Sequence, residues 1–340
     1  MTSHNTEATG PVRSIDVEAP ARLHLGFLDL HGGMGRRFGS IGLTIDSLVT
    51  RLRVQRAADF SADGPGAERA LRYARDFTAS LGIEGGVHIG LQQAIPDHVG
   101  LGSGTQMALA VGEAIAQLHG RGGSGRDIAQ ALGRGNRSGI GIGAFEQGGF
   151  ILDCGRGETA AVPPVAVRLA FPENWRILLL FDTRGQGLHG KQEVEAFSRL
   201  PEFPEHNAAH ICHLVMMKIL PGILEQHLQR VADAIGEIQQ VVGDYFAPAQ
   251  GGRFTSPVVA DALEWIRAQG LTGVGQSSWG PTGFVLLEDE AQGQWLQRGL
   301  RQRFGEVSAL RWQQVAARNR GASLNLIQPP TRLRQKKRTP

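Results

Sequence analysis

The chain has 340 residues, of which 41% are hydrophobic and 20% are charged. This length and composition exclude a largely disordered protein and favour two globular domains of roughly 150 residues each. The 35 basic residues exceed the 32 acidic ones by only three, and part of that excess sits in a basic tail over residues 329–340. The tail is interpreted as a solvated end, so we expect no nucleic-acid partner.

The cysteines and the beginning of the chain bear on where the protein works. Cys154 and Cys212 form no CxxC pair, so neither a disulfide framework nor a cysteine-based zinc site is indicated. Residues 1–11 are polar and are expected to be a flexible leader without the apolar core of a signal peptide. No apolar stretch approaching the ~18 residues of a membrane span is expected. We therefore expect a soluble, cytoplasmic protein without membrane contact, and a homodimer as the commonest assembly.

The first half of the chain shows both strand and helix patterns. Alternating apolar residues predict strands over 48–54 and 87–91, and apolar residues at helical spacing predict a helix over 67–81. A second apolar stripe predicts a helix from Met107 to Leu118 that ends near Gly120. The glycine-rich residues that follow, 133–157, predict tight turns around a buried element.

The second half mixes the same kinds of element. Three prolines within 162–172 predict the domain junction. An apolar strand over 177–181 is followed by a helical run over 211–220, which Pro221 is expected to separate from an amphipathic helix over 224–242. A strand over 284–287 and a helix over 295–304 complete the pattern. No regular alternation of strands and helices is visible, so we predict an α+β protein with domains over 12–168 and 169–328.

A glycine-rich segment lies between a predicted strand and a predicted helix. Its closely spaced glycines allow a sharp turn, and the helix start directs unpaired N–H groups and a partial positive charge outward, as phosphate-binding sites do. The segment lacks the Gly-Lys-Ser/Thr ending of a Walker A loop and the spacing of a dinucleotide fingerprint. A purely structural helix cap is the alternative. The expected phosphate-binding residues are Pro96, Gly100, Leu101, Gly102, Ser103, Gly104 and Thr105.

The Pro-x-x-x-Gly-Leu-Gly-Ser pattern that begins at Pro96 resembles the phosphate-binding motif of the GHMP kinases. The Ala-Pro-Ala-Arg block at 19–22 and the Gly-Gln-Ser-Ser-Trp-Gly-Pro block at 275–281 are similar to the N-terminal and C-terminal blocks of that superfamily. The resemblance implies a two-domain GHMP-kinase-like α+β fold. Its N-terminal domain would be like ribosomal protein S5 domain 2 and its C-terminal domain would be ferredoxin-like.

One departure from the kinases points to a particular branch. Gly141 stands where the kinases carry a catalytic aspartate, and a glycine cannot take a hydroxyl proton. The runs from His24 to Leu30, from Arg137 to Gly149, from Gly187 to Gly190 and over 275–281 resemble the β-ribofuranosylaminobenzene 5'-phosphate synthases. That resemblance implies transfer from phosphoribosyl diphosphate to 4-aminobenzoate or 4-hydroxybenzoate, with release of carbon dioxide and diphosphate. This reaction is the first step toward tetrahydromethanopterin, and Mg²⁺ is the implied cofactor.

Charged residues in the first block are the first candidates for catalysis. Arg22 is expected to hold a phosphate or the arene carboxylate, or else to form an ion pair at the end of a strand. His24 is a site residue or a satisfied structural histidine. Asp29 is a candidate Mg²⁺ ligand together with Ser103, and capping of the turn that follows it is the alternative.

Further candidates lie in the second half. Asp182, Arg184 and His189 follow a strand into a glycine-containing loop, where catalytic groups are often displayed, and a solvated loop is the alternative. Gln276, Ser277 and Ser278 are expected to close over the substrate. Two other functions remain open at this point: an ATP-dependent GHMP-type kinase with a relocated carboxylate, and a non-catalytic sugar-phosphate sensor.

Overall fold

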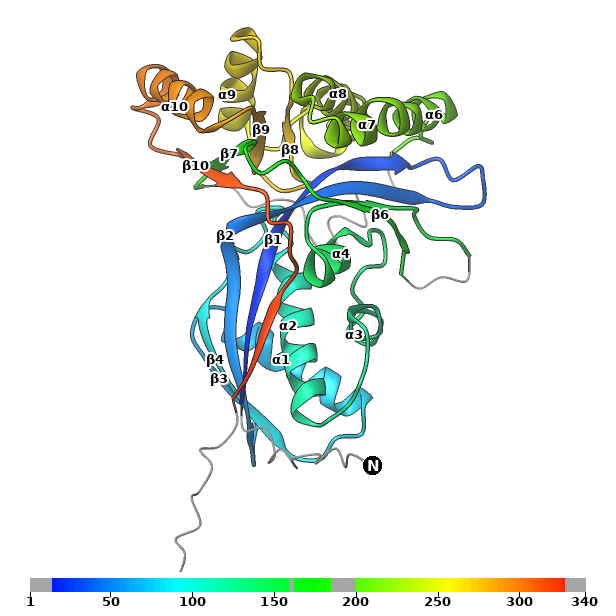
Figure 1. Cartoon of the computed structure of the whole chain (residues 1–340), viewed down its shortest axis with the longest axis vertical. Helices are drawn as coiled ribbons and strands as arrows, with labels where there is room; N and C mark the ends of the chain where they lie inside the picture. Colours follow the sequence, from blue (N-terminus) through cyan, green and yellow to red (C-terminus); the bar gives the residue numbers. More distant parts are fainter. Residues whose placement is uncertain (1–13, 159–161, 185–199, 328–340) are drawn as a thin grey trace, which may run out of the picture.

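The computed structural model describes residues 14–158, 162–184 and 200–327. Its strands form a seven-stranded sheet and a four-stranded sheet, which belong to the lower and upper parts of the molecule in Figure 1. The expected leader, the tail and His189 lie outside the described residues. The predicted mixture of helices and strands in two packed units is confirmed.

The first sheet is built on two long antiparallel strands, β1 and β2, whose register runs from Ser14 opposite Gln55 to Asp29 opposite Phe38. Helices α1 to α4 lie together on one side of this sheet in Figure 1. Its strands are β1 (Ser14–Asp29), β2 (Phe38–Ala57), β3 (Ser61–Asp63), β4 (Gly86–Gln93), β5 (Phe150–Asp153), β6 (Val165–Leu169) and β11 (Ser323–Ile327). The helices are α1 (Ala67–Ser80), α2 (Ser103–Leu118), α3 (Gly125–Ala131) and α4 (Ile140–Glu146).

Strand β1 serves two hydrophobic cores. Ile15 and Val17 pack into the core between the first sheet and its helices, whereas Leu23 and Leu25 pack into a core shared with the second domain. The pairing with β2 shifts register between Pro20 and Arg22, and such irregularities bend and twist a strand. The shift therefore lies where β1 passes from one core to the other.

The second sheet has the strand order β10-β7-β9-β8, with every neighbouring pair antiparallel. Its elements follow the β-α-β-β-α-β sequence of a ferredoxin-like domain, which confirms that expectation. The strands are β7 (Arg176–Asp182), β8 (Val274–Gln276), β9 (Gly283–Leu287) and β10 (Leu310–Ala316). The helices are α6 (Glu205–Leu214), α7 (Leu220–Leu224), α8 (Leu228–Gln250), α9 (Pro257–Ala268) and α10 (Glu290–Phe304).

Three sequence predictions need correction. The proline-rich stretch over 162–172 contains β6, a strand of the first sheet, because its prolines flank the strand instead of interrupting it. Pro221 does not separate two helices: it lies within the helical run Glu205–Leu224, just after a π-helical turn, and the break before α8 falls at 225–227. The second domain does not run without interruption to 328, because β11 pairs with β1 in the first sheet.

The helical run Glu205–Leu224 also differs from expectation. It is apolar and long enough, by length and composition alone, to cross a membrane, because α6 continues through a π-helical turn (Val215–Ile219) into α7. The core helix of a soluble protein passes the same test. Ile211 and Ile219 are fully buried in the core beneath α8.

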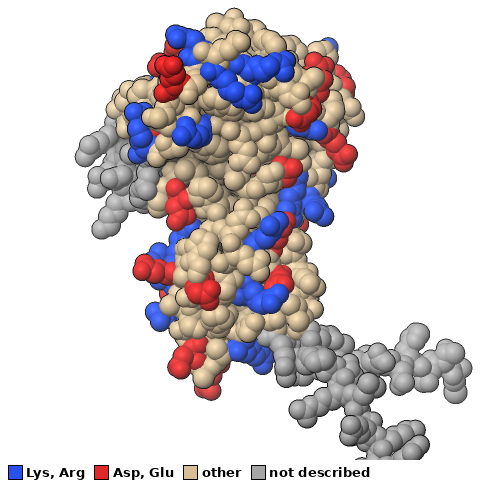
Figure 2. All heavy atoms as spheres, turned by 90° about the vertical axis from the view of Figure 1, so that its left-hand side faces the viewer, with Lys and Arg blue, Asp and Glu red and all other residues tan. Residues whose placement is uncertain are grey.

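Charges are mixed on the face drawn in Figure 2. Blue basic and red acidic side chains alternate over both parts of the molecule on this side, and neither kind covers a broad area. The small net charge of the chain is therefore not concentrated on this face.

Gln239 of α8 joins the two domains. Its side-chain nitrogen donates to the carbonyl of Leu25, 2.7 Å away, and its oxygen accepts from the backbone N–H of Gln276, 2.8 Å away. We predict that Gln239→Met lowers the free energy of unfolding by about 2–4 kcal/mol, since two buried backbone groups lose their partners. Urea denaturation measures the loss. The control Gln229→Met, at an exposed position of the same helix, is expected to change stability by less than about 0.5 kcal/mol.

Candidate active site

The glycine-rich segment forms the start of α2, as the sequence predicted. Gly102 precedes the helix in the left-handed conformation, with φ of 84°, and no side chain caps the first turn. Arg22 of β1 fixes the segment: its backbone N–H donates to Leu101 and its guanidinium to the carbonyl of Gly100, 2.6 Å away. Amide hydrogens of the first turn of α2 are thus left for an anion.

A pocket lies over this helix start, and we call it the loop pocket. It contains about 640 Å³ of atom-free space, including its mouth. Three arginines, Arg22, Arg69 and Arg134, line it, and none of the described lining residues is acidic. The lining residues are Arg22, Arg69, His98, Gly100, Gly102, Ser103, Gly104, Thr105, Arg134, Ser278, Trp279 and Gly280. Its charge and its free amides fit a phosphorylated ligand.

The arginines of the loop pocket differ in their partners. Arg69 pairs with Asp97. Arg134 makes no side-chain hydrogen bond or ion pair within the described part of the chain, and its buried Nε is without a partner. A Cβ atom at Gly104 would lie 2.8 Å from its Nη2 atom, so this guanidinium packs directly on the first turn of α2. Arg134 is therefore the arginine most available to a phosphate.

The loop, β1 and the 275–281 block meet at one hydroxyl group. Ser277, which is fully buried, accepts a hydrogen bond from the backbone N–H of His24 at 3.0 Å and donates one to the carbonyl of Gly100 at 2.8 Å. A Cβ atom at Gly100 would lie 2.1 Å from the Ser277 carbonyl oxygen. Ser277 thus fixes the position of Gly100, and with it the glycine-rich loop, relative to β1.

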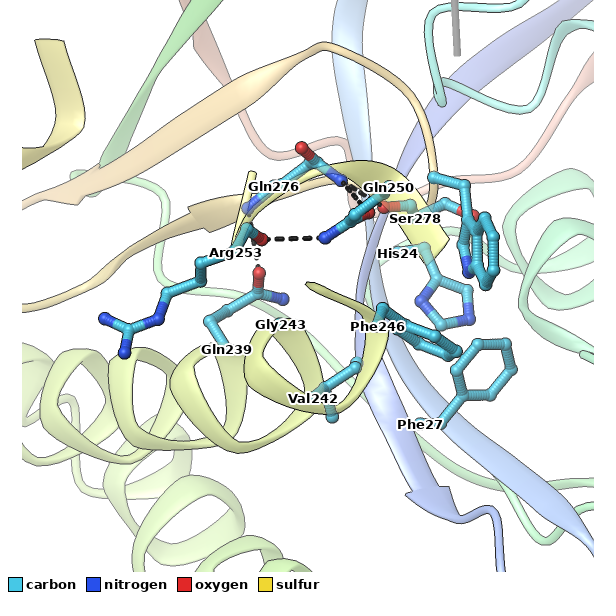
Figure 3. A pocket seen from close by; sticks show the side chains of 12 residues that line it. His24, Phe27, Gln239, Val242, Gly243, Phe246, Gln250, Arg253, Gln276 and Ser278 are labelled. Atoms are coloured by element: carbon cyan, nitrogen blue, oxygen red, sulfur yellow. Dashed lines mark hydrogen bonds between the residues drawn. The ribbon is translucent and has the colours of Figure 1, made fainter. Parts of the chain in front are cut away.

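A second pocket adjoins the loop pocket, and we call it the aromatic pocket (Figure 3). It lies between β1, α8 and the 275–281 block, and its atom-free space is about 340 Å³ when the open solvent at its mouth is included. Ser278 and Trp279 line both pockets, so a ligand in one lies next to a ligand in the other. The lining residues are His24, Gly26, Phe27, Gln239, Val242, Gly243, Phe246, Gln250, Arg253, Gln276, Ser278 and Trp279.

His24 is held neutral in this pocket. Burial, reinforced by the charge of Arg22, lowers the pKa of the imidazole from the usual 6.5 to about 3. Its side chain is almost completely buried, and its Nε2 atom has no hydrogen-bond partner among the described residues. His24 therefore offers an uncharged polar group.

The position of the missing kinase aspartate is filled by close packing. Gly141 of α4 lies beside α2, where a Cβ atom would be 2.9 Å from a methyl carbon of Thr105. The side-chain nitrogen of Gln106 donates to the Gly141 carbonyl, 2.7 Å away. A carboxylate side chain at this position would require the side chain of Thr105 to shift.

Two expected catalytic aspartates hold local structure instead. Asp29 accepts hydrogen bonds from the backbone N–H groups of His31 and Gly32, at 2.8 Å each, and lines neither pocket. It caps a turn, which was the alternative interpretation.

Asp182 likewise lines neither of the two pockets. It binds Arg184 and accepts from the hydroxyl of Ser256 at 2.9 Å. The hydrogen bond from Arg184 is the main reason that the pKa of Asp182 is lowered. Both Asp182 and Arg184 are therefore used in joining β7 to the start of α9.

The described residues do not form a magnesium site by themselves. No group of three or more histidine, cysteine, aspartate or glutamate side chains is arranged to hold a metal in the described part of the chain. Ser103 lines the loop pocket and Asp29 does not, so the two expected ligands are not brought together there. Mg²⁺ prefers carboxylate and phosphate oxygens, and the described loop pocket supplies no carboxylate.

The remaining expected residues divide between the pockets. Gly100, Gly102, Ser103, Gly104 and Thr105 line the loop pocket, and Gln276 lines the aromatic one. Leu101 is buried in the core, and Pro96 is exposed outside the loop-pocket lining.

Several lining residues could not be predicted from the sequence. Arg69 and Arg134 lie in segments with no motif, and Phe246 and Gln250 lie beyond the apolar stripe used to predict α8. The available signal was weak: a Phe about one turn beyond the stripe and an Arg inside a glycine-rich run.

Fold and loop together define a protein of the GHMP kinase type. Family models for the N-terminal and C-terminal domains of GHMP kinases match residues 67–149 and 219–306. Homoserine kinase from Cytophaga hutchinsonii has a similar structure, with a TM-score of 0.66 and 19% identity, covering 94% of this chain and 100% of that one. Mevalonate diphosphate decarboxylase from Staphylococcus aureus is also similar, with a TM-score of 0.64 and 14% identity, covering 92% of this chain and 98% of that one.

Curated relatives narrow the class. A β-ribofuranosylphenol 5'-phosphate synthase from Methanothermobacter thermautotrophicus is 30% identical over 296 residues, covering 81% of this chain and 89% of that protein. The protein of the same name from Archaeoglobus fulgidus is 30% identical over 328 residues, covering 91% and 99%. The chain belongs to the β-ribofuranosylphenol 5'-phosphate synthase family, within the GHMP kinase superfamily.

The contact between Gly100 and Ser277 yields a prediction. Gly100→Ala places a Cβ atom against the Ser277 carbonyl at a residue whose φ is +88°, and we expect it to lower the free energy of unfolding by more than about 2 kcal/mol. Gly133→Ala is the control: its φ is +62° but its Cβ atom meets nothing within 4 Å, so only the backbone cost of roughly 1–2 kcal/mol remains. Urea denaturation measures both losses of stability. Equal losses in the two variants would contradict a stabilising role for the close contact between Gly100 and the Ser277 carbonyl.

The lowered pKa of His24 yields a second prediction. Between pH 6.5 and 3 the unfolded chain binds a proton at His24 that the folded chain does not, so stability falls as the pH is lowered. From pH 7 to pH 5 the loss from this residue is about 2 kcal/mol. We expect His24→Phe to lose that much less stability than the wild type over this interval, as measured by urea denaturation at both values. If the wild type and His24→Phe lose the same amount of stability between pH 7 and pH 5, His24 is protonated in the folded protein and the prediction is wrong.

Proposed function

We propose that the protein transfers the ribose 5-phosphate of phosphoribosyl diphosphate to 4-hydroxybenzoate or 4-aminobenzoate, with loss of carbon dioxide. The product is a β-ribofuranosylarene 5'-phosphate, and diphosphate is released. The name of the archaeal relatives indicates a phenol product for those proteins. The observation that carries the proposal is an arginine-lined pocket in which no described lining residue is acidic, together with Gly141, which packs against Thr105 of this lining where the kinases carry a catalytic carboxylate.

The loop pocket fits the first part of this reaction. As the bond between the anomeric carbon and diphosphate breaks, negative charge grows on the leaving oxygen and the sugar becomes oxocarbenium-like. The first-turn amides of α2, with Arg22 and Arg134, are placed to bind that negative charge in a partly buried pocket, where such contacts are strong. Arg134 needs no rearrangement, because no described side chain occupies it.

The second part of the reaction explains why a base is unnecessary. The ring carbon that bears the carboxylate attacks the anomeric carbon, forming the new carbon–carbon bond. The bond to the carboxylate then breaks, its electron pair returns to the ring, and carbon dioxide departs. No ring proton has to be removed. A glycine at position 141 suits this chemistry, whereas a kinase needs a group that orients or accepts a hydroxyl proton.

Magnesium forms part of the proposal as a companion of the substrate. No carboxylate lines the described loop pocket. We therefore propose that Mg²⁺ enters bound to the diphosphate and that the Ser103 hydroxyl is the protein group that would contact it. The bound ion would neutralise part of the diphosphate charge. We further propose a cytoplasmic homodimer, the commonest assembly of such enzymes.

The test is release of labelled carbon dioxide. Purified protein with phosphoribosyl diphosphate, Mg²⁺ and carboxyl-labelled 4-hydroxybenzoate or 4-aminobenzoate is expected to release label. In Arg134→Gln the KM for phosphoribosyl diphosphate is expected to rise by about tenfold or more, because a charge-assisted contact to phosphate is lost. The KM for the arene is expected to stay within about twofold.

The matched control is Arg121→Gln, at an exposed arginine outside the loop-pocket lining, which should behave as wild type. Absence of label release with both arenes would overturn the proposed function. Consumption of ATP that depends on a small alcohol would instead favour a kinase.

A further inference from the structure

The aromatic pocket is shaped for a flat ring. Four aromatic side chains, His24, Phe27, Phe246 and Trp279, line it. The rings of His24 and Phe27 lie 4.5 Å apart at 59°, and those of Phe246 and Trp279 lie 4.6 Å apart at 61°. Phe27 and Phe246 complete the set at 6.3 Å. Tilted ring pairs at such distances attract one another, and a further aromatic ring packs favourably in the same kind of arrangement.

The Nε2 atom of His24 lines this pocket, is buried and lacks a hydrogen bond among the described residues. A buried polar atom without a partner is costly, so a ligand group that forms a hydrogen bond with it gains affinity. Figure 3 shows the His24 imidazole among the labelled side chains of the pocket, near Phe27 and Phe246.

The neutral His24 ring can offer Nε2 as an acceptor. A neutral imidazole has one N–H group and one lone pair for hydrogen bonding. In the tautomer with the hydrogen on Nδ1, the lone pair lies on Nε2, the atom that has no partner among the described residues. A ligand that donates a hydrogen bond to Nε2 selects this tautomer.

Arg253 is the charged side chain among the described lining residues, and it is already neutralised. It binds Asp244 through two hydrogen bonds of 2.7 and 3.0 Å. Gln276 is also engaged: its oxygen accepts from the backbone N–H of Thr255, and its nitrogen donates to the carbonyl of Ser278. A ligand can therefore bind Nε2 of His24 without breaking these contacts.

We propose that the aromatic pocket binds the arene substrate and that Nε2 of His24 accepts the hydrogen of its 4-hydroxyl or 4-amino group. This inference rests on the proposed function, because it places the second substrate beside the loop pocket through the shared residues Ser278 and Trp279. It makes His24 a specificity-determining residue that selects arenes with a hydrogen-bond donor para to the carboxylate.

The same hydrogen bond would assist the reaction. When a hydroxyl or amino group donates to an acceptor, its oxygen or nitrogen releases more electron density into the ring. That density accumulates at the para carbon, which is the carbon that bears the carboxylate and attacks the sugar. His24 binds a proton too weakly to remove that hydrogen fully, so its role is to polarise and to orient the group.

The test compares two arenes of similar size in the absence of turnover. Calorimetry with the full-length protein, inorganic diphosphate and Mg²⁺ measures the affinities for 4-hydroxybenzoate and for 4-fluorobenzoate, which has no donor. The wild type is expected to prefer 4-hydroxybenzoate by about tenfold. In His24→Phe, which keeps an aromatic ring and removes the acceptor, we expect the ratio to fall to about one.

A matched control is available at His119. Its Nε2 atom is also buried without a partner among the described residues, and burial also lowers its pKa, but it lines neither the loop pocket nor the aromatic pocket. His119→Phe is expected to keep the wild-type ratio.

Three results would overturn the inference: a wild-type ratio near one, an unchanged ratio in His24→Phe, or binding of neither arene. The wild-type ratio decides the matter even if the variant fails to fold. Because label release is measured separately, a protein that releases carbon dioxide but shows no donor preference would retain the proposed function and lose this inference.

Discussion

The hydroxyl group of Ser277 is the contact on which the rest of the site depends. It accepts a hydrogen bond from the N–H of His24, which is 253 positions away in the chain, and donates one to the carbonyl of Gly100, which is 177 positions away. Because it is fully buried, water cannot take over either bond, and loss of one partner would leave a buried polar group unsatisfied. One side chain thus sets β1, the phosphate loop and the 275–281 block in register. The loop pocket and the aromatic pocket adjoin because those three segments meet there.

Glycines make this meeting possible. A Cβ atom at Gly280 would lie 2.2 Å from the carbonyl carbon of Val99, so the 275–281 block and the loop touch through their backbones. Gly141 likewise lets α4 approach α2, where a Cβ atom would lie 2.9 Å from a methyl carbon of Thr105. The chain thus keeps the glycine-rich helix start, while close packing takes the space at position 141.

The sequence was most informative where local physics decides the structure. Glycines before an apolar helix predicted the start of α2, alternating residues predicted part of β2 and β4, and a continuous apolar run predicted β7. It misled where a carboxylate had a near neighbour to bind: Asp29 and Asp182 are satisfied by groups two or three residues away. Helix α4 was not predicted because its glycines have a low helix propensity. They are present because they allow close tertiary packing.

Residues brought in by tertiary structure alone carried no signal. Arg134 reaches the first turn of α2 from a glycine-rich turn, and Phe246 reaches the aromatic pocket from the far part of α8. Neither belongs to a motif, and their contacts with the site depend on how the two domains pack. A histidine with an unfilled ring nitrogen is likewise visible only once its surroundings are known.

The pairing of β11 with β1 anchors both ends of the ferredoxin-like domain in the first sheet. The chain leaves the first sheet after β6 and re-enters it through β11, whose Ile327 lies opposite Ser14. The ferredoxin-like domain is therefore an insertion held by two connections, residues 170–175 and 317–322. Because β11 pairs with the strand that holds Arg22 and His24, the return connection keeps the inserted domain beside the residues with which it forms the two pockets.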